Sequence, residues 1–368
     1  MPSSTPEVII RIGSHAEKEY ITRLGSFVDG IIIGANLIEA TPGASASLLI
    51  SLGGGKSRKI YIDPMTYAFG TYADPESGFV RSDLDWIKSD QIRKDKSGKR
   101  LVRDFKKSYK GLAERIGLPL SRAVDSSKAV DPDSIIDVKE QKQFCSNVIE
   151  YQLNRIGKVF EDDPELKSLI PNLPKPKALF APYFYIEPTR TWDWLKTNNN
   201  LMKSAVSLET GMPIHGVVCA DVSHLDNAEF RKRILAELPQ IGIKGVWLWF
   251  SKFQEERESI NILRGYREIV SSLADSRLEV YSMHGGLFSL CLSKYGMSGI
   301  SHGIGYGEQK DVVPVIGQST PTVRYYLPAL AKRLGVPDIE RAFDALGVKT
   351  PKDFHEKVCD CAVCKGII

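Results

Sequence analysis

Short apolar runs rich in β-branched and aromatic residues recur along the chain, and polar or glycine-rich residues follow each run. Such runs predict buried strands. Residues 228–238 and 254–271, between the later runs, have the apolar spacing of amphipathic helices. Strand and helix therefore alternate, and we expect a parallel sheet. The eight predicted strands span residues 8–13, 30–35, 59–64, 178–188, 215–222, 245–251, 278–284 and 299–306.

Eight strand–helix units predict an α/β fold, the (β/α)8 TIM barrel. The connection at residues 65–177, between the third and fourth strands, is much longer than a usual crossover. It is therefore predicted to be an insertion, with a helix over 138–159. Asp226 is expected to cap the helix that follows the fifth strand. Beyond the eighth strand we predict helices over 323–334 and 339–346.

The expected organisation is a barrel with its insertion over residues 1–320, followed by C-terminal helices and a Cys-rich zinc-binding tail over 321–368. No run of about eighteen apolar residues occurs, and the first residues lack the blocks of a signal peptide. Three of the six cysteines are scattered and three fall in the last ten residues, unlike a disulfide framework. We therefore expect a cytoplasmic protein that has no membrane partner.

Charge is unevenly distributed along the chain. The formal net charge is +4, but residues 93–110 contain nine basic and two acidic residues, so the rest of the chain is net negative. Such a stretch is typical of proteins that bind a polyanion such as tRNA or DNA. A solvated loop and helix face is the alternative interpretation. The predicted nucleic-acid-binding residues are Arg93, Lys94, Lys99, Arg100, Arg103, Lys106 and Lys107.

In TIM barrels, the catalytic groups lie where the strands end. Asp63 and Asp221 each follow an apolar run, and with His302 they are the predicted catalytic residues. A buried carboxylate at such a point can serve as base or nucleophile, although it can also simply cap a loop. We expect Asp63→Asn to abolish turnover while preserving the fold. The predicted substrate-binding residues are Glu187, His284, Gly285, Gly286 and Tyr306.

The two consecutive glycines are expected to let backbone N–H groups approach a planar or anionic ligand. A planar heterocycle is expected to stack near Tyr306 or Trp249. A tight turn without a ligand is the alternative interpretation of the glycines, and a satisfied core histidine is the alternative interpretation of His302.

Three cysteines lie within six residues near the C-terminus, at Cys359, Cys361 and Cys364. Thiolates at this density predict a tetrahedral Zn²⁺ site. His355 is the local choice for a fourth ligand, because it lies one helical turn before Cys359. Three reduced thiols at a frayed terminus are the alternative.

The motif Cys359-Asp360-Cys361-Ala362-Val363-Cys364 resembles the zinc subdomain of the tRNA-guanine transglycosylase superfamily. Residues 280–286 resemble its seventh strand, and Asp63 falls where that family has an aspartate involved in proton transfer and base recognition. The resemblance implies a (β/α)8 barrel, Zn²⁺, and exchange of guanine for a 7-deazaguanine through an aspartate nucleophile that attacks the ribose anomeric carbon.

The chain also departs from that family. Pro64-Met65-Thr66 follows Asp63 in place of Ser-Gly-Gly, and the eighth strand has Ser301-His302 where the family has its nucleophilic aspartate. The family's fourth zinc ligand is a histidine some two dozen residues beyond the cysteines.

Two functions lead from the sequence, and a third, an unrelated barrel hydrolase or lyase that uses His284 and His302, is also open. The first is a divergent base-exchange glycosyltransferase of the queuine or archaeosine type, in which Asp63 or Asp221 is the working carboxylate and the basic stretch binds phosphates. The second is a noncatalytic nucleic-acid-binding subunit that has lost the nucleophile. The sequence also leaves open whether the chain acts as a homo- or hetero-oligomer. A pocket ringed by Asp63, Asp221 and His302 would favour the first function, and apolar filling of the barrel mouth the second.

Overall fold

The computed structural model of the chain describes residues 5–53, 58–70, 72–74, 79–82, 85–88, 107–126, 129–161, 173–304, 311–312, 324–327 and 332–367. The chain divides into two compact units. One comprises Met1–Lys18 and Phe27–Pro314, and the other comprises Glu19–Ser26 and Val315–Ile368.

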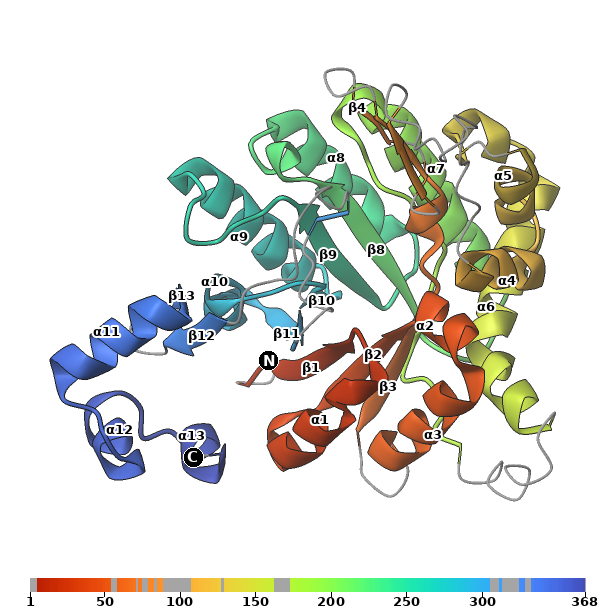
Figure 1. Cartoon of the computed structure of the whole chain (residues 1–368). Helices are drawn as coiled ribbons and strands as arrows, with labels where there is room; N and C mark the ends of the chain where they lie inside the picture. Colours follow the sequence, from red (N-terminus) through yellow and green to blue (C-terminus); the bar gives the residue numbers. More distant parts are fainter. Residues whose placement is uncertain are drawn as a thin grey trace, which may run out of the picture. The chain divides into compact units, whose positions relative to one another are not determined.

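The first unit contains an eight-stranded parallel sheet in the order β3-β2-β1-β11-β10-β9-β8-β7 (Figure 1). Its edge strands β3 and β7 approach each other, and the Lys177 N–H donates to the Ile60 carbonyl over 2.8 Å. The sheet is therefore a nearly closed TIM barrel, which confirms the predicted fold and its eight strands. The strands are β1 Glu7–Ile12, β2 Gly30–Gly34, β3 Lys59–Asp63, β7 Leu179–Phe180, β8 Ile214–Asp221, β9 Gly245–Ser251, β10 Glu279–Ser282 and β11 Met297–Gly303.

The fourth barrel strand, β7, is much shorter than the predicted 178–188. Pro182 lacks an N–H group and cannot donate to a continuing ladder. Pairing with β8 resumes only as an isolated bridge between Ile186 and Ala220. Residues 181–187 therefore form an irregular segment that runs along the barrel mouth.

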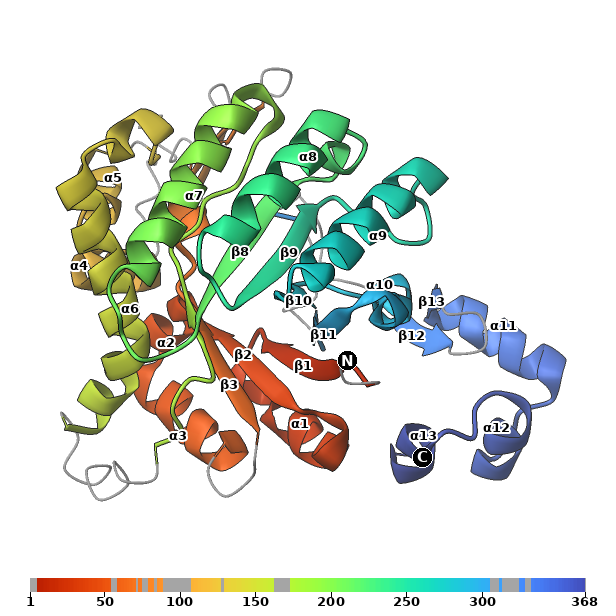
Figure 2. The ribbon, with the colours of Figure 1, turned by 180° about the vertical axis from the view of Figure 1, so that it is seen from behind.

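Helices alternate with the strands, and α7, α8 and α9 cover the outer side of β8 and β9 (Figure 2). Asn227, not Asp226 as predicted, caps α8, since its side chain accepts from the Phe230 N–H over 3.0 Å. Ser259 caps α9, which therefore begins at Ile260 rather than at residue 254. The helices of this part are α2 Ala35–Ala40, α3 Pro42–Gly53, α7 Thr191–Val206, α8 Ala228–Glu237, α9 Ile260–Asp275 and α10 Leu287–Cys291, whereas α1 Lys18–Leu24 belongs, from Glu19 on, to the second unit.

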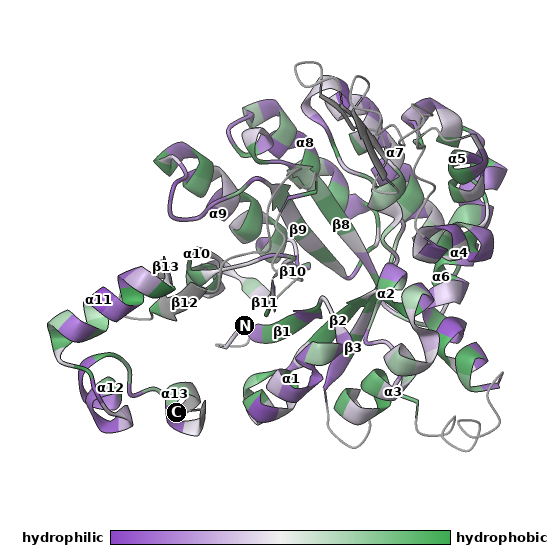
Figure 3. Ribbon diagram, viewed as in Figure 1, coloured by the Kyte–Doolittle hydropathy of each residue, from purple (hydrophilic) through white to green (hydrophobic). Residues whose placement is uncertain are grey.

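The barrel interior is a packed aromatic core. The rings of Trp247 and Tyr281 stack with centroids 4.6 Å apart, and Tyr61 meets Trp247 edge-on at 5.1 Å. Trp247 donates its indole N–H to Nδ1 of His215 over 3.1 Å, and burial lowers the pKa of His215 to about 4. The histidine is therefore a neutral core residue. Hydrophobic residues run along the barrel strands, while the helices are banded with polar ones (Figure 3).

The predicted insertion is present, but its last helix belongs to the barrel. Helix α6 Val138–Glu161 packs between α3 and α7, which is the position of the third barrel helix. The additional structure therefore lies between residue 65 and the start of α6. In the described part it contains the antiparallel strands β4 Tyr72–Asp74, β5 Phe79–Ser82 and β6 Asp85–Lys88, and the helices α4 Lys107–Ile116 and α5 Leu120–Ser126.

In the second unit, one predicted helix is replaced by strands. The residues expected to form a helix over 323–334 contain two antiparallel strands, β12 Arg324–Leu327 and β13 Lys332–Gly335. Tyr325 and Tyr326 favour extended structure, and pairing with β13 stabilises it. The predicted helix over 339–346 is confirmed as α11 Val336–Leu346, which is followed by α12 Pro351–Lys357 and α13 Ala362–Ile367. Across the part of the chain that is described, no helix has the length and apolar character needed to cross a membrane.

A buried ionic network joins the insertion to the barrel. Glu39 on α2 accepts from Nε of Arg155 on α6 at 2.6 Å and from Nε of Arg115 on α4 at 2.9 Å. The Tyr151 hydroxyl donates to the same carboxylate over 2.9 Å. Burial opposes the charge of Glu39, but these hydrogen bonds outweigh it and lower the pKa of the carboxyl. Three helices are thus held by one anion.

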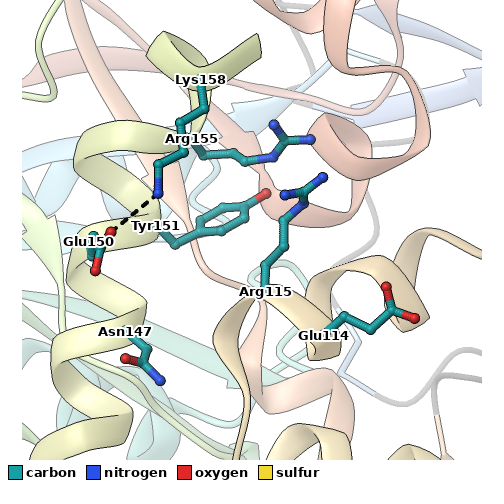
Figure 4. Close-up of a pocket in the computed structure, with 7 residues that line it drawn as sticks. All are labelled: Glu114, Arg115, Asn147, Glu150, Tyr151, Arg155 and Lys158. Carbon is teal, nitrogen blue, oxygen red and sulfur yellow. Dashed lines mark hydrogen bonds and ion pairs between the residues drawn. The ribbon is translucent and has the colours of Figure 1, made fainter. Parts of the chain in front are cut away.

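Figure 4 shows the cavity of about 400 Å³ that this network borders. Arg115, Tyr151 and Arg155 converge on it, and Lys158 pairs with Glu150 over 3.2 Å beside it. Three basic and two acidic side chains line the cavity, and Glu39 of the adjoining network supplies the third negative charge. The lining comprises Glu114, Arg115, Asn147, Glu150, Tyr151, Arg155 and Lys158.

We predict that Glu39→Gln destabilises the fold by about 3 kcal/mol, because it leaves the buried Arg155 charge without its anion. The folded-state pKa of Glu39 lies below the ordinary value of 4.5, so its contribution is present above that value and is lost as the pH falls through the folded-state pKa. Urea unfolding at about pH 7 and at about pH 4 should therefore show weaker acid sensitivity in the variant than in the wild type.

The matched control is Glu150→Gln, since the Glu150–Lys158 pair is more than half exposed. Its free energy of unfolding should change by less than about 1 kcal/mol. Equal effects of the two substitutions would contradict the proposed role of the network.

Candidate functional site

Asp63 lies at the C-terminal end of β3 and is fully buried, with 0% of its surface exposed. Its Oδ2 accepts from Nη2 of Arg11 over 2.7 Å. Its Oδ1 accepts from the Tyr183 hydroxyl and from the Met65 N–H, both at 2.9 Å. Both carboxylate oxygens are therefore engaged inside the protein, and neither faces solvent.

Arg11, on β1, is a site residue that the sequence reasoning missed. Burial opposes its charge, but the carboxylate of Asp63 together with Tyr67 and Tyr183 outweighs burial and raises the pKa of the guanidinium above its ordinary value. Its guanidinium carbon also lies 6.0 Å from the ring centroid of Trp249. The signal available in the sequence was one charged residue inside the apolar run Val8-Ile9-Ile10-Arg11-Ile12.

Asp221 ends β8 and is in a different environment from Asp63. Its Oδ1 accepts from the Ser223 N–H over 3.0 Å, and its Oδ2 accepts from the Tyr185 hydroxyl over 3.0 Å. Nζ of Lys252, a side chain that is about half exposed, lies 3.5 Å from Oδ2. Burial opposes ionisation, but the hydrogen bonds from Ser223, the Lys252 charge and the Tyr185 hydroxyl lower the pKa of Asp221. Asp221 is thus an ionised carboxylate next to a solvent-accessible ammonium group.

The irregular segment at residues 181–187 contacts both Asp63 and Asp221. Tyr183 and Tyr185 are two residues apart in the stretch after β7, and their hydroxyls donate to Asp63 and Asp221 respectively. Alternation along an extended chain places both side chains on the same face. Sequence reasoning missed both tyrosines, although the Tyr-Phe-Tyr spacing is the period of an extended segment.

Glu187 and His224 are buried near the same segment. Glu187 accepts from the Trp194 indole N–H over 3.4 Å, and burial raises the pKa of its carboxyl. The His224 ring lies 2.9 Å from the Thr191 hydroxyl and 3.2 Å from the Asp221 carbonyl, and burial lowers its pKa. Glu187 therefore contacts Trp194 and Thr191 of α7.

The turn at Gly285 and Gly286 already contains an anion from the chain itself. Glu255, from the loop between β9 and α9, accepts from the Gly286 N–H over 2.8 Å and from the Phe288 N–H over 2.9 Å. The Gly285 N–H donates to the Ser301 carbonyl over 2.9 Å. The backbone donors that the sequence assigned to a ligand are therefore used within the fold.

His302 lies on the outer face of β11, which corrects its predicted place beside the aspartates. Its register partner is Ile10, whereas Gly303 pairs with Arg11, whose side chain reaches Asp63 inside the barrel. Neighbouring strand residues point to opposite faces, so His302 is directed away from Asp63. Its Nδ1 lies 2.9 Å from the Gly285 carbonyl.

Aromatic rings fill much of the barrel mouth. Tyr67 stacks on Tyr183 at 5.5 Å and meets Trp249 edge-on at 4.7 Å, and the His284 ring lies 4.7 Å from Trp249. Trp249 is buried, so the expected stacking of a heterocycle on its face would require these rings to move. A small cavity between β9, β10 and α9 is lined by Leu248, Trp249, Phe250, Phe253, Tyr266, Ser282 and His284, and not by Asp63, Asp221 or His302.

The predicted nucleic-acid-binding residues fall mostly outside the described part of the chain. Lys107 is exposed and begins α4. Tyr306 lies outside the described residues. The basic residues Arg93, Lys94, Lys99, Arg100, Arg103 and Lys106 also lie outside them.

The three cysteines of the second unit form a cluster that can hold a metal ion. The sulfur atoms of Cys359, Cys361 and Cys364 all lie within 4.8 Å of one another. Tetrahedral zinc with Zn–S bonds of about 2.3 Å separates its sulfurs by roughly 3.8 Å, so the cluster fits such an ion. The Cys364 N–H donates to Sγ of Cys361 over 3.5 Å. Burial and the neighbouring thiols raise the pKa of Cys364 to about 12, and a bound cation would reverse that preference.

His355 is not part of this cluster, contrary to the prediction of a fourth ligand. Its Nδ1 lies 3.2 Å from the Cys359 carbonyl. Its ring lies edge-on to Phe354, with centroids 5.7 Å apart. In the last turn of α12, the His355 imidazole therefore contacts the Cys359 carbonyl rather than the cysteine sulfurs.

No protein-family model matches the chain. A search of curated proteins also finds no match.

We predict that Asp63→Asn destabilises the fold by about 3 to 5 kcal/mol, because it leaves the buried Arg11 guanidinium without its counter-charge. This revises the expectation that Asp63→Asn preserves the fold. The double variant Arg11→Met/Asp63→Asn should recover part of the loss, since it removes both charges. Denaturant unfolding of the two variants measures the difference, and an unchanged midpoint in the single variant would contradict a charge-paired Asp63.

Proposed function

We propose that this chain is a divergent base-exchange glycosyltransferase of the tRNA-guanine transglycosylase type, which acts on a nucleic acid and on a base of the 7-deazaguanine class. The observation that carries the proposal is Asp221. It is an ionised carboxylate at a barrel strand end, aligned by Tyr185 and next to the half-exposed Lys252. A nucleophilic carboxylate needs these properties.

The proposed reaction exchanges the guanine of the nucleic acid for a free incoming base and needs no third reactant. An oxygen of Asp221 attacks the sugar anomeric carbon, the bond from that carbon to guanine N9 breaks, and guanine leaves with the bonding electrons and takes up one proton. N9 of the incoming deazaguanine then loses one proton and attacks the same carbon, which releases the carboxylate. Protons and charges balance over the two steps.

The two aspartates take different roles in this proposal. The Asp63 side chain is 0% exposed and pairs with a buried guanidinium, whereas the Asp221 side chain is 9% exposed and pairs with the half-exposed Lys252. A nucleophile needs an oxygen that can reach substrate. Asp63 is therefore assigned to holding Arg11 and Tyr183 at the mouth. Asp221 stands in for the nucleophile that the family resemblance placed on the eighth strand, where Ser301 donates to the Met283 carbonyl over 2.7 Å.

Nucleic acid is the proposed macromolecular partner because of the charge of residues 93–110. Lys107, the one predicted contact within the described residues, is exposed at the start of α4. Because the resemblance to the transglycosylases implies it, the metal of the cysteine cluster is proposed to be Zn²⁺ in a structural role. The free thiols of the described cysteines suit a reducing compartment such as the cytoplasm.

A second candidate is a noncatalytic nucleic-acid-binding subunit. Two observations favour it: the aromatic rings packed at the mouth, and the Glu255 carboxylate in the turn predicted to hold ligand. This candidate predicts nucleic-acid binding without base exchange.

Incorporation of labelled guanine or 7-cyano-7-deazaguanine into tRNA and into duplex DNA tests the proposal. We expect incorporation into one of the two by the wild type and a loss of at least about a thousandfold in Asp221→Asn, because an amide is not nucleophilic. Asp226→Asn, an exposed aspartate in the same loop, is the matched control and should retain activity. Binding without incorporation in the wild type would favour the second candidate.

The purified chain should contain about one zinc per molecule, because three thiolates provide most of a tetrahedral shell. Cys361→Ser should remove the metal. His355→Ala should retain it, since His355 lies outside the cluster. The exposed Cys291 provides the control Cys291→Ser. Elemental analysis measures the content, and a zinc-free wild type with three freely reactive thiols would contradict the site.

A further inference from the structure

The loop at residues 252–258, between β9 and α9, is anchored by its own Glu255. Oε1 of Glu255 accepts from the Gly286 N–H at 2.8 Å, the Ser289 N–H at 3.1 Å and the Ser289 hydroxyl at 2.8 Å. Oε2 accepts from the Phe288 N–H at 2.9 Å. Four donors on one carboxylate make a strong connection, because each bond to an ionised acceptor is charge-assisted. The loop is therefore fixed to the turn after β10.

Lys252, at the start of the same loop, has a constrained backbone. Its φ is 67°, in the left-handed region that residues with a Cβ rarely adopt. Its N–H donates to the Asp311 carboxylate over 2.6 Å. Such a conformation persists where surrounding contacts hold it in place. The ammonium group of this residue is the one that lies 3.5 Å from Asp221.

We propose that Glu255 is a positioning residue for the mouth: by fixing the loop to the turn after β10, it holds the Lys252 ammonium against Asp221. The proposal rests on the function proposed above, in which Asp221 is the nucleophile. It also gives Gly286 a role, since an added Cβ there would lie 2.5 Å from Oε2 of Glu255. The glycine thus makes room for the carboxylate of the chain itself.

Lys252 comes from a different strand end than the other groups around Asp221. Tyr185 donates from the segment after β7, and the Ser223 N–H and His224 belong to the loop of Asp221. If the loop at 252–258 loses the hydrogen bonds of Glu255, the contacts of Tyr185 and Ser223 with Asp221 remain. The ammonium group of Lys252 then moves away from Asp221. The carboxylate of Asp221 then loses one stabilising cation, so its pKa should rise.

The test is a carbon-13 NMR titration of the Asp221 carboxyl group, assigned by its loss in Asp221→Asn. It is measured in the wild type and in the variants Lys252→Met, Glu255→Gln and Lys252→Met/Glu255→Gln. We expect an upward pKa shift in both single variants and no larger shift in the double variant than in Lys252→Met, because both changes remove the same interaction. Glu256→Gln, an exposed neighbour in the loop, is the control and should leave the titration unchanged.

Ser289→Ala removes the hydrogen bond from the Ser289 hydroxyl to Glu255, one of the four bonds, and leaves Glu255 itself unchanged. It gives a second measurement if Glu255→Gln folds poorly. It should shift the Asp221 pKa upward by less than Lys252→Met does. An unshifted titration in Glu255→Gln and Ser289→Ala, or additive shifts in the double variant, would overturn the proposal. Because the readout is a titration and not turnover, this result is independent of base incorporation, so failure of the positioning role and failure of the proposed function are distinguished.

Discussion

Parallel strands that close into a barrel end at a common rim, and this constraint governs the chemistry of the molecule. Residues far apart in sequence, such as Arg11, Asp63 and Tyr183, meet there because the C-terminal parts of β1 and β3 and the segment after β7 reach the same rim. The rings of Tyr61, Trp247 and Tyr281 fill the barrel beneath them. Charged groups at the mouth are therefore held over an apolar base, where pairing decides their energies.

The meeting of strand ends at the rim gives Asp63 and Asp221 different environments, although their sequence contexts are alike. The carboxylate of Asp63 forms an ion pair with the buried guanidinium of Arg11, and this pair stabilises the barrel mouth. Asp221 is also buried, but its cationic partner Lys252 is about half exposed. The difference arises from neighbours on other strands, since both aspartates follow an apolar run of the same kind. Division of one residue type into a structural and a reactive role is common where environments differ.

The elements that could be predicted from the sequence are those whose pattern is local. The eight strands are apolar and short, and the gap after the third strand is visible by length alone. The cysteine cluster was equally predictable, because three thiols within six residues cannot lie far apart. The hairpin of β12 and β13 was missed because pairing between two short segments outweighed the helical spacing of residues 323–334.

The errors at the site have non-local causes. The prediction chose His302, which lies on the outer face of β11. Deciding between Ser301 and His302 requires the register of β11 against β1, and no local sequence pattern contains that register. The turn at Gly285 and Gly286 is filled by Glu255, whose position follows from the packing of two loops. Arg11 was recognisable only as a charge within an apolar strand, and its partner became apparent with the barrel closed.

The central claim, that Asp221 is the nucleophile beside a structural Asp63–Arg11 pair, is tested most directly by trapping the covalent intermediate. The protein is incubated with its nucleic-acid substrate in the absence of an incoming base, denatured rapidly and digested, and the peptides are analysed by mass spectrometry. The account predicts a sugar adduct on the peptide that contains Asp221. An adduct on the peptide that contains Asp63 would contradict it.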